Sequence, residues 1–124
     1  MSVSVLEIDG FLLASIQESL EDSVALQLRR DLLEGLRRTK APGVLIDVSG
    51  VDVVDSFTAR LLSEIGRAAR LMGAVTVLVG LRPEVAMTMV GLDLELRDVL
   101  TELDVERGLE RLRHRARADR KREW

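Results

Sequence analysis

Two short apolar runs open the chain on either side of Asp9 and Gly10. The first lies within residues 3–8 and the second within residues 11–16. Because glycine accepts the positive φ of a two-residue turn, Asp-Gly between two apolar runs is typical of a β-hairpin. The pattern therefore predicts two antiparallel strands over these residues.

The next segment has the spacing of an amphipathic helix. From Val24 to Leu36, apolar residues recur every four positions with charged residues between them, which predicts a helix over residues 22–39 with one buried face. Three residues near its start can accept hydrogen bonds from free N–H groups: Ser19, Asp22 and Ser23. Ala41-Pro42-Gly43 then ends the helix.

Three more helices are predicted downstream. The second begins directly after Asp55 and ends at Gly73, which suits the left-handed residue that follows many helices. A short third helix is expected from Pro83 to Met89, because proline is favoured in a first helical turn. The last is expected over roughly residues 104–116.

Apolar runs between these helices predict buried strands over residues 44–48 and 74–80, and a brief extended segment over residues 94–96. Strands that alternate with helices imply a mainly parallel sheet. We therefore expect a single α/β domain with a mixed, mainly parallel β-sheet, opened by an antiparallel hairpin, and about four helices. A length of 124 residues suits one such domain.

The charges are unevenly distributed along the chain. Residues 113–124 contain six basic and two acidic residues, a balance of +4, and the other 112 residues contain 12 basic and 19 acidic residues, a balance of -7. We expect a domain over residues 1–112 and a basic C-terminal tail over 113–124 that is solvated or frayed. Such a tail could contact nucleic acid or an anionic surface, but we expect neither partner. Trp124 has no assigned role.

Several residue types on which common enzymes depend are missing or rare. The chain has no Cys, one His at position 114, two Lys and 2% aromatic residues. These counts exclude disulfides and thiolate catalysis, and they argue against a zinc site, a His-paired nucleophile and a base-stacking surface. Neither a signal peptide nor an apolar run of about 20 residues is present. We expect a cytoplasmic protein without metal or cofactor.

Candidate site residues gather where the strand over 44–48 leads toward the second helix. In α/β sheets, ligand and modification sites lie beyond the carboxyl ends of the strands. Asp55 is placed as the helix N-cap and Ser56 as the first helical residue, where a phosphate would be tolerated by free N–H groups. Five further residues shape this stretch: Asp47, Ser49, Gly50, Asp52 and Thr58. Composition alone leaves a second interpretation open, in which all of these residues only cap and turn the chain.

Other phosphate or catalytic sites fit the sequence less well. Neither a P-loop pattern nor the G-x-G-x-x-G pattern of dinucleotide-binding folds is present. A receiver domain would need an acidic pair after the first strand and a late Lys, and neither is in place. Asp47 and Asp52 could form an acid/base or Mg²⁺ pair, but nothing else in the sequence converges on them. We therefore expect no enzymatic activity.

The strand, loop and helix start resemble those of STAS domains, the fold of anti-sigma-factor antagonists. Two segments carry the resemblance: Val44-Leu-Ile-Asp-Val-Ser-Gly-Val-Asp-Val-Val-Asp-Ser56 and Ala68-Ala-Arg-Leu-Met-Gly-Ala-Val-Thr-Val-Leu-Val-Gly80. The resemblance extends over residues 3–112. Within the family, the chain is most similar to the stand-alone RsbS type of the stressosome, in the segments 13–17, 55–57, 71–74 and 103–109.

The resemblance implies a switch protein, not a catalyst. Proteins of this type hold a serine/threonine kinase of the RsbT type, together with larger scaffold paralogues of the RsbR type. Carried over to this chain, Ser56 would be phosphorylated by the kinase, with Asp55 as its orienting neighbour. Phosphorylation would release the kinase, and a phosphatase would reset Ser56. A large hetero-oligomer is expected, or a homodimer when the chain is alone.

Two differences from the larger scaffold paralogues narrow this expectation. Those paralogues carry an N-terminal sensory domain, whereas this chain starts almost at its first strand. They also carry a phosphorylatable Thr near the start of the first helix, where this chain has Asp22 beside Ser23. We expect no second regulated site there. The alternative function is a small anti-anti-sigma factor that binds an anti-sigma factor kinase directly and is controlled by the same serine.

Overall fold

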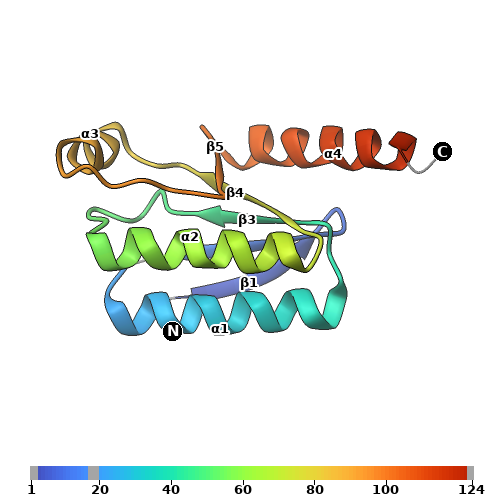
Figure 1. The fold of residues 1–124 in the computed structure, drawn as a ribbon, viewed down its shortest axis with the longest axis horizontal. Helices are drawn as coiled ribbons and strands as arrows, with labels where there is room; N and C mark the ends of the chain where they lie inside the picture. Colours follow the sequence, from blue (N-terminus) through green and yellow to red (C-terminus); the bar gives the residue numbers. More distant parts are fainter. Residues whose placement is uncertain (1–2, 17–19, 123–124) are drawn as a thin grey trace.

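The computed structural model describes residues 3–16 and 20–122, and its elements follow the predicted order (Figure 1). The strands are β1 (Val3–Ile8), β2 (Phe11–Ile16), β3 (Gly43–Asp47), β4 (Val75–Val79) and β5 (Leu100–Glu102). The helices are α1 (Asp22–Thr39), α2 (Ser56–Leu71), α3 (Pro83–Gly91) and α4 (Val105–Arg122). The strands form a five-stranded sheet in the order β1-β2-β3-β4-β5.

The sheet is mixed, as predicted. β1 pairs with β2 in antiparallel register, and the three pairs from β2 to β5 are parallel. Asp9 and Gly10 connect β1 to β2 with φ angles of 54° and 83°, the two positive φ angles that a tight hairpin turn needs. The predicted hairpin is therefore confirmed.

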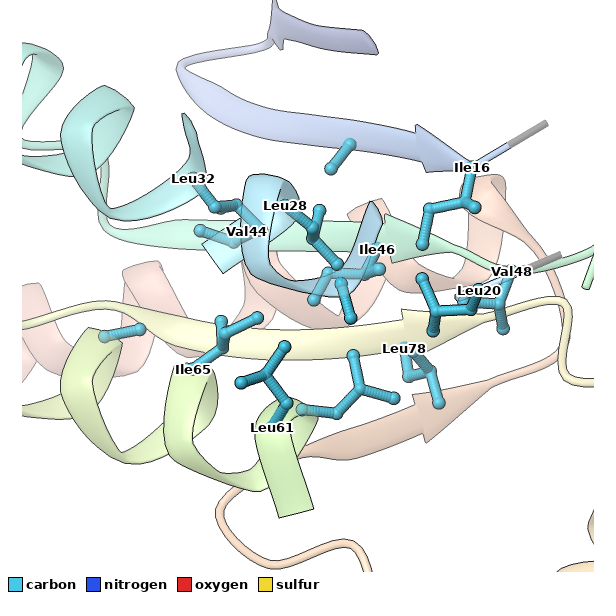
Figure 2. Packing of buried hydrophobic residues seen from close by; sticks show 14 of the residues in the cluster. Ile16, Leu20, Leu28, Leu32, Val44, Ile46, Val48, Leu61, Ile65 and Leu78 are labelled. Atoms are coloured by element: carbon cyan, nitrogen blue, oxygen red, sulfur yellow. The ribbon is translucent and has the colours of Figure 1, made fainter. Parts of the chain in front are cut away.

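Helices cover both faces of the sheet. α1 and α2 lie against one face, and α4 lies against the other (Figure 1). Because side chains alternate along a strand, Val44 and Ile46 of β3 pack with α1 and α2, whereas Leu45 packs with Leu109 and Leu112 of α4. Figure 2 shows the cluster on the α1 and α2 side. Burial on both faces explains why β3 is an almost continuous apolar run.

The fifth strand lies later in the chain than predicted. Residues 94–96 form no strand, and β5 follows at Leu100–Glu102, where it pairs with the second half of β4. Leu94 and Leu96 are instead partly buried against the cluster on the α1 and α2 side. Their alternation reflects the packing of an irregular segment, and a strand of three residues is too short to produce a pattern of its own.

α1 has the predicted bounds, but neither Asp22 nor Ser23 is its N-cap residue. Its N-cap residue is Glu21, whose side chain makes no capping hydrogen bond. Asp22 and Ser23 lie inside the helix, one and two positions past the cap, and Ser19 lies outside the described residues. Asp22 still contributes a negative charge to the first turn, where the helix dipole favours it.

α4 is longer than the predicted helix. It continues from Val105 to Arg122, so the predicted boundary between residues 112 and 113 falls inside a helix, and the segment expected to fray is helical through Arg122. Arg113 Nη2 lies 2.6 Å from Asp9 Oδ2 in the β1–β2 turn. This ion pair connects the first residue of the basic segment to the hairpin. Trp124 lies outside the described residues.

Candidate functional site

The loop between β3 and α2 lies at the carboxyl end of a central strand. Every third residue of this loop is buried, at 1 to 2% exposure: Val48, Val51 and Val54. These three side chains belong to the cluster on the α1 and α2 side. They hold the loop against the core. Asp52, which lies between Val51 and Val54, and Asp55, which follows Val54, are exposed.

Asp47 shapes the first turn of this loop. Its Oδ1 accepts a hydrogen bond from the backbone N–H of Ser49 at 2.9 Å, a local contact that aspartate often makes in turns. Gly80, which follows β4 with a φ of 78°, lies against the same turn, and a Cβ there would come within 2.9 Å of the Ser49 Cβ. Asp47 is half-buried, whereas Ser49 and Gly50 are exposed. Asp47 therefore serves the geometry of the loop.

Arg82 joins the loop to the start of α3. Its Nη1 lies 2.5 Å from Asp52 Oδ1, and its Nε donates to the backbone carbonyl of Ser49 at 3.0 Å. One guanidinium thus holds two points of the loop with two of its donors. The sequence interpretation missed Arg82 because 30 positions separate it from Asp52, and no spacing signal links them.

Asp55 caps α2 and thereby sets the position of Ser56. Its Oδ1 accepts a hydrogen bond from the Thr58 N–H at 2.8 Å. That hydrogen bond favours the carboxylate form and lowers the pKa of Asp55 below its ordinary value. Ser56 is the first helical residue and is exposed. The predicted cap and helix start are confirmed, and the role of Ser56 as a phosphoacceptor stays a prediction.

Thr58 lies on the opposite, buried side of the same helical turn. It is 0% exposed, and its Oγ1 donates to the backbone carbonyl of Leu20 at 3.3 Å. This hydrogen bond holds the start of α2 against the segment before α1. The hydroxyls of Ser49 and Ser56 are therefore accessible to a modifying enzyme, and that of Thr58 is not.

A shallow groove of about 450 Å³ extends along α2 from Ser56. Ser56, Arg60 and Arg67 lie on its α2 wall, and Glu95 and Arg97 lie on the wall formed by the segment between α3 and β5. The sequence interpretation did not find this groove, because its second wall comes from residues that carried no motif.

Two exposed apolar residues lie near Ser56 in the sequence. Val53 is 62% exposed and Phe57 is 36% exposed. Exposed large apolar residues beside an accessible hydroxyl suit a surface that another protein covers.

The remaining candidate chemistry lacks a matching arrangement. Asp47 and Asp52 are held by different partners, the Ser49 amide and the Arg82 guanidinium. Among residues 3–16 and 20–122, no group of three or more His, Asp or Glu side chains could hold a metal ion. No described helix has the length and apolar character needed to cross a membrane.

Comparison with known proteins assigns the fold to a family. The STAS domain model matches residues 2–107. The RsbT co-antagonist protein RsbRA of Bacillus subtilis is 35% identical over 92 residues, which cover 74% of this chain and 34% of that protein. The RsbT co-antagonist protein RsbRD of the same species is 29% identical over 101 residues, which cover 82% of this chain and 36% of that protein. The chain thus spans about a third of the length of these relatives.

Solved structures extend the match over most of the chain. A serine-to-glutamate variant of RsbS from Moorella thermoacetica is 37% identical with a TM-score of 0.80, covering 94% of this chain and 99% of that one. A chain of a solved structure described as the molecular architecture of the stressosome is 34% identical, with a TM-score of 0.71. The match covers 92% of this chain and 99% of that one. The antagonist SpoIIAA, at 13% identity and a TM-score of 0.71 over 90% and 96%, shares the fold. The chain therefore belongs to the STAS-domain family, with the RsbS and RsbR proteins of the stressosome among its relatives.

Proposed function

We propose that this chain is a non-enzymatic regulatory scaffold of a stressosome, which holds a switch serine/threonine kinase and releases it when Ser56 is phosphorylated. The observation that carries this proposal is the position of Ser56, an exposed hydroxyl on the first residue of α2 directly after the Asp55 cap. Similarity to RsbS, and to relatives described as RsbT co-antagonists, supports an RsbT-type kinase as the partner.

The proposed modification is a phosphoryl transfer from ATP. The Ser56 oxygen attacks the γ-phosphorus, the bond between that phosphorus and the β,γ-bridging oxygen breaks, and ADP leaves while the hydroxyl proton is lost. A phosphatase resets the switch when water hydrolyses the phosphoserine ester to serine and inorganic phosphate. The kinase and the phosphatase supply the catalytic groups, so the chain contributes an accessible hydroxyl on a rigid helix start.

The surface around Ser56 supports release as the consequence. Val53, three residues before Ser56, and Phe57, directly after it, have exposed apolar side chains from which a bound kinase would exclude water. Phosphorylation adds about -1.5 to -2 charges, which would have to be desolvated under the docked partner. Since charges at the edge of an interface decide which partner is accepted, the phosphate weakens kinase retention.

The proposed assembly is a large hetero-oligomer with RsbR-type paralogues in the cytoplasm. Support comes from the similarity to a chain of the stressosome and to the RsbR-type relatives. Those relatives are about three times as long as the matched segment.

Mass spectrometry after incubation with ATP and an RsbT-type kinase tests the proposal. We expect one phosphate on Ser56 and none on the Ser56→Ala variant. Ser49→Ala is the matched control, because Ser49 is an exposed hydroxyl of the same loop, and it should leave phosphorylation unchanged. Phosphate on another residue, or continued modification of Ser56→Ala, contradicts the proposal.

Size-exclusion chromatography after co-expression with an RsbR-type paralogue tests the assembly. We expect both chains to elute together as a very large particle. Elution of this chain as a monomer or dimer contradicts the scaffold role and favours the small antagonist that binds its kinase directly.

A further inference from the structure

Arg60 follows Ser56 by one helical turn, and both line the groove along α2. We propose that Arg60 binds the phosphate of phosphorylated Ser56 and holds it in this groove. This inference rests on the proposed phosphorylation of Ser56 and names the residue that responds to the added charge.

The geometry of α2 brings the two side chains together. Residues four apart on a helix are neighbours, with Cβ atoms about 5–6 Å apart, and an anion placed before a cation along the chain is the favourable order. An exposed arginine side chain is long enough to place its guanidinium on a phosphate at that spacing and can bind two of its oxygens. Arg60 is exposed, so no repacking is needed for this movement.

The amide groups at the helix start cannot serve the phosphate fully. The Thr58 N–H already donates to Asp55 Oδ1 at 2.8 Å. The Asp55 carboxylate also lies beside Ser56 and repels a second anion. A cation near Ser56 would therefore stabilise the phosphate beyond what the helix start provides.

Most other charges that face this groove are already engaged. Glu64 pairs with Arg29 at 3.2 Å, and Arg97 pairs with Glu95 at 3.1 Å. Within the described residues, the Arg60 and Arg67 side chains form no ion pair. Of these two, Arg60 is one turn from Ser56, whereas Arg67 lies eleven residues away, about 16 Å along the helix axis. The remaining charged residue, Asp93, lies on the far wall of the groove.

The second pKa of the phosphoserine provides a direct measurement. We would incorporate phosphoserine at position 56 during translation, so that no kinase is involved, and follow the phosphate by ³¹P NMR as a function of pH. A bound guanidinium favours the dianion, so it lowers this pKa. Arg60→Gln should raise the pKa by about 0.3, the value expected of an exposed ion pair on one helix. Arg60→Lys should retain most of the effect.

Arg67→Gln is the matched control, because it removes the same charge from the same groove two turns further from the phosphate. We expect a clearly smaller rise in the phosphoserine pKa, since about 8–10 Å of salt solution screens most of an exposed charge. An unchanged pKa in Arg60→Gln, or an equal rise in both variants, overturns the inference.

This result is separable from the proposed function. If Arg60 lowers the phosphoserine pKa but the kinase does not modify Ser56, the inference holds and the proposed function fails. If the kinase modifies Ser56 and the pKa ignores Arg60, the proposed function stands and the inference fails.

Discussion

The Oδ1 atom of Asp55 accepts a hydrogen bond from the Thr58 N–H at 2.8 Å, and this contact closes the first turn of α2 around Ser56. The Thr58 hydroxyl donates a hydrogen bond to the buried Leu20 carbonyl, whereas Ser56 is exposed to solvent. One helical turn therefore joins an accessible hydroxyl to the core of the domain. Changes at Asp55 or Thr58 should alter stability and the presentation of Ser56 together.

Loss of the cap should destabilise the domain measurably. Asp55→Ala removes the acceptor for the Thr58 N–H and should lower the free energy of unfolding by about 1 kcal/mol. Urea unfolding at neutral pH measures the change. Asp55→Asn keeps an acceptor oxygen at the cap and should stay closer to the unmodified chain, because Asn and Asp cap about equally well. Equal stability of Asp55→Ala and the unmodified chain would show that the cap is dispensable.

The lowered pKa of Asp55 predicts a pH dependence of this difference. Its ordinary value is 3.8, and the hydrogen bond from Thr58 lowers it in the folded chain. The contribution of the carboxylate is therefore complete above about pH 4 and is lost as the pH falls through the folded pKa. The free energy of unfolding of the original chain and of Asp55→Asn can be measured over a series of pH values. The difference between the two should be constant near neutral pH. Only in acid should the chain with Asp55 lose stability relative to Asp55→Asn. A change in this stability difference centred near neutral pH would assign the effect to another group.

Two buried threonines should respond in opposite directions to the same substitution. Thr58 Oγ1 donates to the Leu20 carbonyl, so Thr58→Val leaves a buried acceptor without its donor and should cost about 1–2 kcal/mol. Thr76, on β4, is 1% exposed, and its Oγ1 has no hydrogen-bond partner among the described residues. Thr76→Val should therefore be neutral or stabilising by up to about 1 kcal/mol. Thermal or urea unfolding compares the pair, and a loss of stability in both variants would contradict the assignment.

The contacts of Arg82 predict that removing Arg82 costs more stability than removing its partner Asp52. Arg82→Ala removes the ion pair with Asp52 and the hydrogen bond to the Ser49 carbonyl, and should cost about 1 kcal/mol. Asp52→Ala removes only an exposed ion pair, for which about 0.5 kcal/mol or less is expected. Amide hydrogen exchange of residues 48–55 should rise more in Arg82→Ala. Equal exchange in the two variants would mean that the Ser49 contact does not order the loop.

Close packing of α4 predicts that a helix-favouring substitution is harmful. A Cβ on Gly108 would come within 2.6 Å of Leu45 Cδ2 and 2.8 Å of Val79 Cγ1. Gly108→Ala should therefore cost about 1–3 kcal/mol through overpacking, although alanine favours helices over glycine by about 1 kcal/mol. Gly91→Ala on α3 is the control, because no atom lies within 4 Å of the added Cβ. If both variants gain stability, α4 does not pack on the sheet as described.

Local chemistry decided the parts of the fold that the sequence predicted correctly. The positive φ angles of Asp9 and Gly10 and the capping of α2 by Asp55 follow from neighbouring residues, and the nearly continuous apolar run of β3 indicated a strand that is buried on both faces. The predictions that were wrong concern segments whose structure neighbouring residues did not decide. Leu94 and Leu96 imitate a strand while they pack as an irregular segment. Likewise, α4 extends through a C-terminal segment that was expected to be solvated or frayed, as chain ends commonly are.

The sequence by itself determined the order of elements, the start of α2 and Ser56 as its first residue, because turns, caps and helical periodicity act over a few positions. Only the tertiary structure decided that Arg82 holds Asp52, that Thr58 faces Leu20 and that α2 forms one wall of a groove. These pairs lie 30 or more positions apart. Contacts at that separation form only when the sheet and its covering helices are assembled, so no local pattern in the chain records them.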